Sequence, residues 1–254
     1  MDAVKRTPWP FLVTVVVFVA VWSVLHWLRI WEPWLFPGPL DVARSVWHLA
    51  VTGQLWPSLA STFRLLGISY VMSCLLAGCI AAGLVLVPTF RQGVQPFLLA
   101  FQSLPGIAWL PLALLWFGIQ ERMLLFVTIM GSVFSIAMGM ADAFAIVPPL
   151  YHKVARNMGV HGARLLMRVT VPAATPHLVT AAKVGWSFAW RSLIGAEIIR
   201  SSVGLGFLLN AGHDALDVAQ IFAIMIVLIA IGVIVERVVF ANIERVVRRR
   251  WGLA

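Results

Sequence analysis

The feature that most constrains this chain is a series of apolar stretches, each about as long as a lipid bilayer is thick. Hydrophobic residues make up 61% of the 254 residues, charged residues only 11%, and the mean hydropathy is +0.93. Because about 20 apolar residues span a bilayer as a helix, the pattern predicts an all-α polytopic membrane protein with one transmembrane domain over 1–254. Six transmembrane helices are expected, at 9–28, 65–87, 94–117, 123–143, 178–199 and 219–238.

The segment 39–63, between the first two spans, has a different pattern. Pro39 can occupy the first turn of a helix, and apolar residues recur after it at helical spacing. We expect an interfacial helix here, with tryptophans anchored at the level of the lipid headgroups. Cys74 and Cys79 lie in the second span without a nearby His or Asp, and we interpret them as packing residues rather than metal ligands or a disulfide.

The positive charges indicate how the chain is oriented. With the N-terminus inside, twelve of the 19 Lys and Arg residues fall in cytoplasmic segments, five fall outside, and Lys183 and Arg191 lie within the fifth span. Cytoplasmic loops of membrane proteins collect Lys and Arg, so both termini are expected in the cytoplasm. The same rule accounts for the net charge of +9, and no nucleic-acid partner is expected.

One polar segment, at about 144–176, interrupts the apolar pattern and falls in the cytoplasm in this topology. Pro148 and Pro149 can begin a short helix, and Gly159 can end it in a left-handed conformation. A second helix from His161 to Arg168 is expected to stop before Pro172. The alternative from spacing alone is a basic loop held against anionic lipid headgroups.

This segment resembles the cytoplasmic signature loop of type I ABC importer permeases. That loop begins with Glu-Ala-Ala, has a Gly after three further residues, and ends after nine more in an Ile-x-Leu-Pro-like sequence. The corresponding residues here are Lys153-Val154-Ala155, Gly159 and Val169-Thr170-Val171-Pro172. The spacing is the same, while Lys153 and Val154 depart from the first two residues of the pattern.

The resemblance extends over most of the chain and is closest to the nitrate, sulfonate, taurine and bicarbonate branch. Three further regions are similar to that branch: Phe36-Pro37-Gly38-Pro39 in the outer connection, Pro105 to Ile119 in the third span and following turn, and Trp190 to Leu208 in the fifth span and the loop after it.

The resemblance implies a permease subunit that moves a small solute, delivered by an extracytoplasmic solute-binding protein, into a bacterial cytoplasm. It also implies two cytoplasmic ATPase subunits and a second permease copy. A homodimer of this chain, embedded in the lipid of the inner membrane, is expected. The residues implied in coupling to the ATPase are Lys153, Ala155, Arg156, Gly159, Val169 and Pro172.

ATP and Mg are expected on the partner ATPase, with no cofactor or catalytic residue on this chain. The only lysines, Lys5, Lys153 and Lys183, are preceded by Val4, His152 and Ala182. Because no Gly-Lys pair exists, the chain has no Walker A loop to hold phosphates.

Charged residues in the fifth span are candidates for the translocation pathway, because exposing a charge to lipid is costly. Arg191 lies too deep to reach the inner headgroups easily, whereas Lys183 could extend to them. Together they would favour an anionic solute such as a sulfonate, taurine, nitrate or bicarbonate. The alternative for Arg191 is a structural ion pair. Glu197 lies near the outer end of the span, about 120° around the helix from Arg191, so a direct pair between them is not expected.

The third span is a second candidate for the pathway. Pro105-Gly106 and Pro111 interrupt it and free backbone groups that lipid cannot satisfy. Gln102 and Ser103 add hydrogen-bonding groups beside the break. A kinked packing helix is the alternative. Small residues in the second and fourth spans, including Gly67, Gly78, Gly131 and Gly139, are expected to let helices approach closely.

Two other classes of protein were weighed. An intramembrane enzyme needs a nucleophile with a base, or a set of metal ligands, within the spans, and neither H-E-x-x-H nor G-x-S-x-G occurs. A self-sufficient secondary carrier or channel for a small anion predicts paired inverted halves, and no matching halves are found. The arginine cluster at the C-terminus, from Arg245 to Arg250, is interpreted as a lipid-facing anchor.

Overall fold

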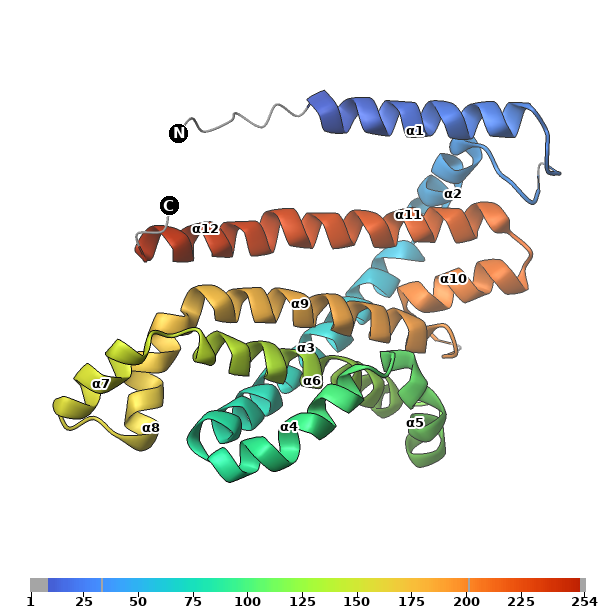
Figure 1. The fold of residues 1–254 in the computed structure, drawn as a ribbon. Coiled ribbons are helices and arrows are strands. Elements are labelled where there is room, and N and C mark those ends of the chain that lie inside the picture. The colour runs from blue at the N-terminus through green and yellow to red at the C-terminus, as the bar shows by residue number, and fades with distance from the viewer. Residues whose placement is uncertain (1–8, 33, 201, 252–254) are drawn as a thin grey trace.

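The computed structural model describes residues 9–32, 34–200 and 202–251, and every regular element in these ranges is a helix (Figure 1). Lys5 and Arg6, which entered the orientation argument, lie outside the described residues. The elements in chain order are α1 (Trp9–Trp27), α2 (Pro39–Val51), α3 (Leu55–Leu86), α4 (Pro88–Gln102), the 3-10 helix η1 (Gly106–Trp109), α5 (Leu110–Phe117), α6 (Glu121–Ala145), α7 (Pro149–Asn157), α8 (Gly162–Leu165), the π-helix η2 (Leu166–Thr170), α9 (Val171–Glu197), α10 (Leu205–Asp214), α11 (Val218–Ile234), the π-helix η3 (Val235–Phe240) and α12 (Ala241–Arg250).

Helices occupy all six predicted spans, but not all of them are simple membrane helices. Among the described residues, α3, α6 and the continuous helix Val218–Arg250 are long and apolar enough to cross a membrane on those criteria alone. The helix α1 is apolar but shorter. The helix α9 is long but carries more polar residues, which is expected for a span that packs against protein or borders a polar path.

The predicted interruption of the span 94–117 is present. The chain bends by 100° between α4 and the η1–α5 segment. Pro105 has an extended backbone at the break, with φ −55° and ψ 136°, and Pro111 lies in the first turn of α5. Two prolines and a glycine within seven residues therefore produce a broken span rather than a mild kink.

The helix predicted within the segment 39–63 is present, but the second span begins earlier than predicted. A helix does begin at Pro39, but it ends at Val51, and α3 begins at Leu55 instead of residue 65. Gly53 separates the two helices with a φ of +76°, a backbone conformation that glycine adopts readily. The second span is thus the end of a 32-residue helix, which is about 48 Å long at 1.5 Å per residue.

The centre of the bundle is α6, which packs mainly against α3 and α9. Small residues bring these helices close together: a Cβ at Gly185 of α9 would overlap Ile136 of α6, and a Cβ at Gly131 of α6 would overlap Ser192 of α9. The packing role predicted for the fourth-span glycines is confirmed at Gly131. Nothing lies within 4 Å of a Cβ placed on Gly67 or Gly78 of α3, so those two glycines lie on an open face of the described chain.

The ends of the bundle differ in content. The helices α7 and α8 lie at the same end as the start of α1 and the end of α12, while α5 and α10 lie towards the other end (Figure 1). We call the first of these the α7–α8 end.

Pro172 does not end a helix, contrary to the prediction. The chain is helical without a break from α8 through η2 into α9, and Pro172 is in the first turn of α9. The residues before it form a π-helix, whose wider turn offers room for a proline ring and relieves the clash that the ring causes in an α-helix. The second part of the predicted polar segment is therefore continuous with the fifth span.

Candidate functional site

The helix α7 has an exposed apolar side. Leu150, Tyr151, Val154 and Met158 lie within about 100° of one another around the helix, and all are at least half exposed. We call these four residues the α7 stripe. Lys153 and Arg156, on another side of α7, are also exposed. An apolar stripe rimmed by charge at one end of a membrane protein is typical of a surface that binds another protein.

Gly159 ends α7 as predicted. Its φ is +79°, and the N–H of Val160 donates to the carbonyl of Ala155 while the N–H of Gly159 donates to the carbonyl of Arg156. These two hydrogen bonds form a Schellman motif, in which the residue at the glycine position is left-handed. The motif turns the chain back so that α8 follows α7 directly.

The side of α7 away from the stripe contacts η2, which leads directly into α9. His152 Nε2 lies 3.0 Å from Thr170 Oγ1 of η2, and Ala155 is buried. Leu166 of η2 also packs in one apolar cluster with Phe144 and Val147 at the end of α6. The α7 stripe is therefore presented on a support that is continuous with α9. Val169, another predicted coupling residue, is half-buried within η2 rather than exposed on this stripe.

A groove of about 350 Å³, with a mostly apolar lining and a few polar side chains, lies among α4, α6 and α9, in the half of the bundle that carries α7 and α8. Gln102 lines it, and its Oε1 is buried without a hydrogen-bond partner among the described residues. The other polar lining residues are Ser135 and Asp142 of α6 and His177 and Thr180 of α9. A buried, unpaired amide oxygen costs free energy unless water or a ligand reaches it, so Gln102 marks a point in the groove where water or a solute would be stabilised.

Arg191 extends this polar side of α9 away from the groove. Residues seven apart return to nearly the same side of a helix, about 20° short of two full turns, so His177, Val184 and Arg191 share one side. All three are exposed. The guanidinium of Arg191 lies 5.9 Å from the ring centre of Phe188. We call the side formed by His177, Thr180, Val184 and Arg191 the open side of α9.

Lys183 belongs to a neighbouring groove, between α9 and α11. Lys183, Arg191 and Glu236 line this groove of about 380 Å³ together with apolar and aromatic side chains. The Nζ of Lys183 lies 3.0 Å from a carboxylate oxygen of Glu236 and 3.8 Å from one of Glu244. The predicted shared side of Lys183 and Arg191 is present, but the charge of Lys183 is compensated by two carboxylates.

Glu197 does not lie on either groove. Its side chain is only 2% exposed, and its carboxylate accepts hydrogen bonds from Thr62 Oγ1 at 2.9 Å and from the N–H of Gly206 at 3.0 Å. Leu205 N–H in turn donates to Thr62 Oγ1. Glu197 thus joins α3, α9 and the start of α10, and the structure gives it a packing role in place of the predicted place in the pathway.

The remaining predicted pathway residues lie at the break in the third span. Ser103 is exposed, and its hydroxyl donates to the carbonyl of Ala100 in its own helix. Pro105 is exposed at the start of η1. Neither residue lines the groove. They follow Gln102, where α4 ends, and so belong to the break in the span and not to the groove.

Sequence reasoning missed several residues that the structure brings together. His152 and Thr170 hold α7 to η2 although 18 residues separate them. Asp142, His177 and Thr180 border the groove. The available signal was polarity near the ends of spans, but such residues are equally typical of ordinary helix ends, so the pattern alone did not single them out.

Comparison with known families decides what this bundle is. Residues 74–251 match the family described as the binding-protein-dependent transport system inner membrane component. The chain belongs to this family. It is therefore a non-catalytic permease subunit of an ABC importer, as the resemblance of its loop implied.

Relatives of the permease agree on the branch. It is 25% identical to the taurine transport system permease protein TauC of Escherichia coli, over 88% of this chain and 83% of that protein. It is 23% identical to the nitrate import permease protein NrtB of Synechococcus elongatus, over 89% of each. It is 27% identical to the aliphatic sulfonates transport permease protein SsuC of E. coli, described as putative, over 84% of this chain and 81% of that one.

The fold of the permease is that of a solved importer. An inward-facing structure of the MetNI methionine ABC transporter contains a chain that superposes with a TM-score of 0.65, covering 78% of this chain and 95% of that one at 19% identity. At this identity the likeness shows the fold alone. The all-α permease fold predicted from the sequence is confirmed.

Proposed function

We propose that this permease carries a small solute that is an anion or bears an anionic sulfonate group, of the sulfonate, taurine or nitrate kind, across the inner membrane along the open side of α9. The observation that carries the proposal is the exposure of Arg191 and Thr180 on α9, the helix at the predicted fifth span. Placing an arginine against lipid costs at least about 2.5 kcal/mol, so this side is best suited to face a polar path. Arg191 supplies the positive charge that an anion requires.

The groove among α4, α6 and α9 supports the same assignment. Gln102, whose Oε1 lacks a partner among the described residues, lines this groove next to α9, the helix that carries Arg191. Asp142 is the acidic residue in the groove lining, and it would repel an anion at the α7–α8 end. A solute that has passed Arg191 would therefore be bound weakly there, which favours its release.

The α7 stripe supports docking on a cytoplasmic ATPase. In this proposal the stripe enters a cleft of the ATPase, and nucleotide-driven closure moves α7 together with η2 and α9. The α7–α8 end then faces the cytoplasm, with both termini. The second permease copy is a second molecule of this chain, and the open side of α9 and the glycine face of α3 at Gly67 and Gly78 are available to meet it.

Uptake into proteoliposomes tests the proposal. The permease is reconstituted with its ATPase and binding protein, and labelled taurine, nitrate and ethanesulfonate are compared with the neutral solute cytosine and with methionine. The proposal predicts ATP-dependent uptake of at least one of the three test solutes and none of the other two. Uptake of cytosine or methionine alone would contradict the anion assignment.

A further inference from the structure

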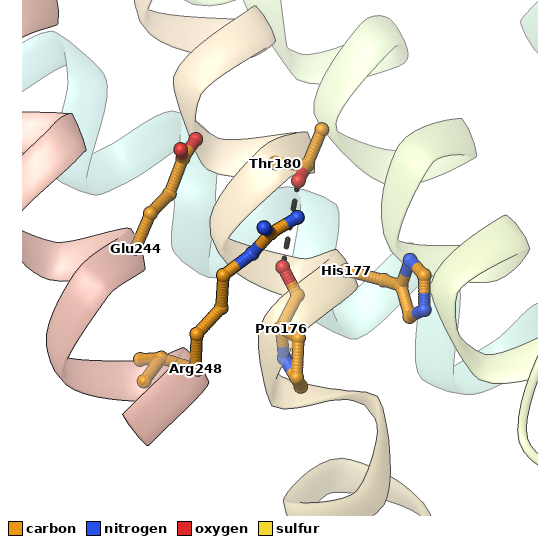
Figure 2. A pocket seen from close by; sticks show the side chains of 6 residues that line it. Pro176, His177, Thr180, Glu244 and Arg248 are labelled. Atoms are coloured by element: carbon orange, nitrogen blue, oxygen red, sulfur yellow. Dashed lines mark hydrogen bonds between the residues drawn. The ribbon is translucent and has the colours of Figure 1, made fainter. Parts of the chain in front are cut away.

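A second polar cavity lies between α9 and α12 at the α7–α8 end (Figure 2). Its volume is about 460 Å³. Two helices supply the lining, which consists of Pro176, His177, Thr180, Glu244, Val247 and Arg248. His177 and Thr180 border both this cavity and the groove of α4, α6 and α9, whereas Arg248 belongs to this cavity only.

Hydrogen-bond donors converge on the cavity. Arg248 extends from α12 towards Pro176 and Thr180 of α9 in Figure 2, and its guanidinium has no hydrogen bond or ion pair with any described residue. The hydroxyl of Thr180 donates to the carbonyl of Pro176 over 3.4 Å, a long hydrogen bond that a better acceptor can replace. The ring of His177 points away from Arg248 in Figure 2, so the two converging donors are Arg248 and Thr180. A guanidinium with neighbouring donors is the arrangement that binds phosphate oxygens.

Glu244 is the acidic residue of the lining. Its carboxylate lies 3.8 Å from the Nζ of Lys183, which pairs more closely with Glu236 at 3.0 Å, and in Figure 2 it lies across Arg248 from His177. Arg248 is the arginine of the lining and the group in it that can bind an anion. The arginines at 245, 249 and 250 add to the positive potential around it.

The other side of α12 indicates where the cavity lies relative to the membrane. Ile243 and Val246 of α12 are exposed, and Val246 lies on the side of the helix away from the cavity-lining residues; α12 continues the membrane helix α11 without a break. Trp251 at its end donates from Nε1 to the carbonyl of Pro172. Apolar side chains followed by a tryptophan and several arginines mark the depth of the lipid headgroups.

We infer that this cavity binds the phosphate of an anionic phospholipid headgroup from the adjacent leaflet, with Arg248 as its principal ligand. The bound phosphate joins α12 to α9. Since α9 is continuous with the support of the α7 stripe, the lipid stabilises the part of the permease that moves with the ATPase.

Lipid retention tests the inference without relying on transport. The complex of permease and ATPase is purified from vesicles of phosphatidylcholine and phosphatidylglycerol, and bound lipids are counted by native mass spectrometry. Arg248→Gln is expected to reduce retained phosphatidylglycerol about tenfold, which corresponds to one charge-assisted hydrogen bond. The matched control, Arg249→Gln, loses the same charge one residue away and outside the cavity lining, and should retain the lipid.

Three outcomes overturn the inference. Equal loss in both variants shows general attraction to the arginine cluster instead of a site. Unchanged retention in Arg248→Gln, with thermal unfolding like that of the wild type, removes Arg248 as the ligand. Displacement of the lipid by inorganic phosphate at millimolar concentration, with equal stabilisation by phosphate alone, shows a site for soluble anions.

Discussion

The two sides of α9 differ more than any other pair of surfaces in the molecule. On the side that packs against α6, Ala181, Gly185 and Ala189 are buried, and their small size lets the helices approach closely. On the open side, Thr180, Val184 and Arg191 are exposed. One helix therefore holds the bundle together on one side and offers a polar surface on the other.

This difference between the two sides indicates how a movement of α7 could reach the proposed solute path on α9. The close contact with α6 leaves α9 little freedom to change shape, and η2 joins it to the support of the α7 stripe without a break. A movement of α7 would thus be transmitted to the open side of α9 as a movement of the helix as a whole. The predictions below alter the two sides and their connection separately.

The largest effect is expected on the buried side. In Gly185→Leu the new side chain overlaps Ile136 of α6, and overpacking of this kind costs about 1–3 kcal/mol or more. Thermal unfolding in detergent should show a clear loss of stability. The control is Gly93→Leu in α4, where no atom lies within 4 Å of a Cβ. Equal stability of the two variants would contradict the close contact.

The next effect is expected at the connection to the ATPase. Val154→Asp places a charge in the α7 stripe, so its affinity for the ATPase should fall at least about tenfold, or about 1.4 kcal/mol. Val203→Asp is a matched control, because Val203 is 49% exposed and Val154 is 50% exposed, and Val203 lies outside α7 and α8. Co-purification measures the affinity, and full binding by Val154→Asp would refute docking through the stripe.

A smaller effect is expected on the open side. Arg191→Gln removes the positive charge of the proposed path and should lower the rate of anion uptake several-fold, up to about tenfold, while the ATPase remains bound. Arg191→Lys should retain part of the rate because it keeps the charge. Uptake that is unchanged in Arg191→Gln would exclude Arg191 from the path.

The smallest effect on stability is expected from the ion pairs of Lys183, which lies on α9 outside both the buried side and the open side. Lys183→Met removes the ion pairs with Glu236 and Glu244, which are partly exposed. Pairs of this kind contribute about 0–1 kcal/mol, so thermal unfolding should change little. A loss as large as that of Gly185→Leu would show that these pairs, not the small-residue contact, hold α9 in place.

Local features of the sequence predicted much of this fold. The apolar stretches predicted the helices, and Pro149 and Gly159 predicted the two ends of α7. Each of these inferences depends on residues close together in the chain, where helix geometry relates position to direction.

The features that sequence reasoning missed depend on contacts between distant residues. Glu197 is buried because Thr62, 135 residues earlier, donates to it. The groove exists only where Gln102, Ser135 and His177 meet from three helices. Pro172 was expected to end a helix, and the π-helix that accommodates it has no recognisable signal in the sequence.

Cysteine labelling along α9 tests the central claim most directly. Cys74 and Cys79 are replaced by alanine, and single cysteines are placed at Thr180, Val184, Gly185 and Ala189 in the complex of permease and ATPase in vesicles. A charged, membrane-impermeant thiol reagent should label Thr180→Cys and Val184→Cys but not the two buried positions, and ATP binding should change the rates at the open side. Equal labelling on both sides of α9, or none at the open side with and without ATP, would contradict the account.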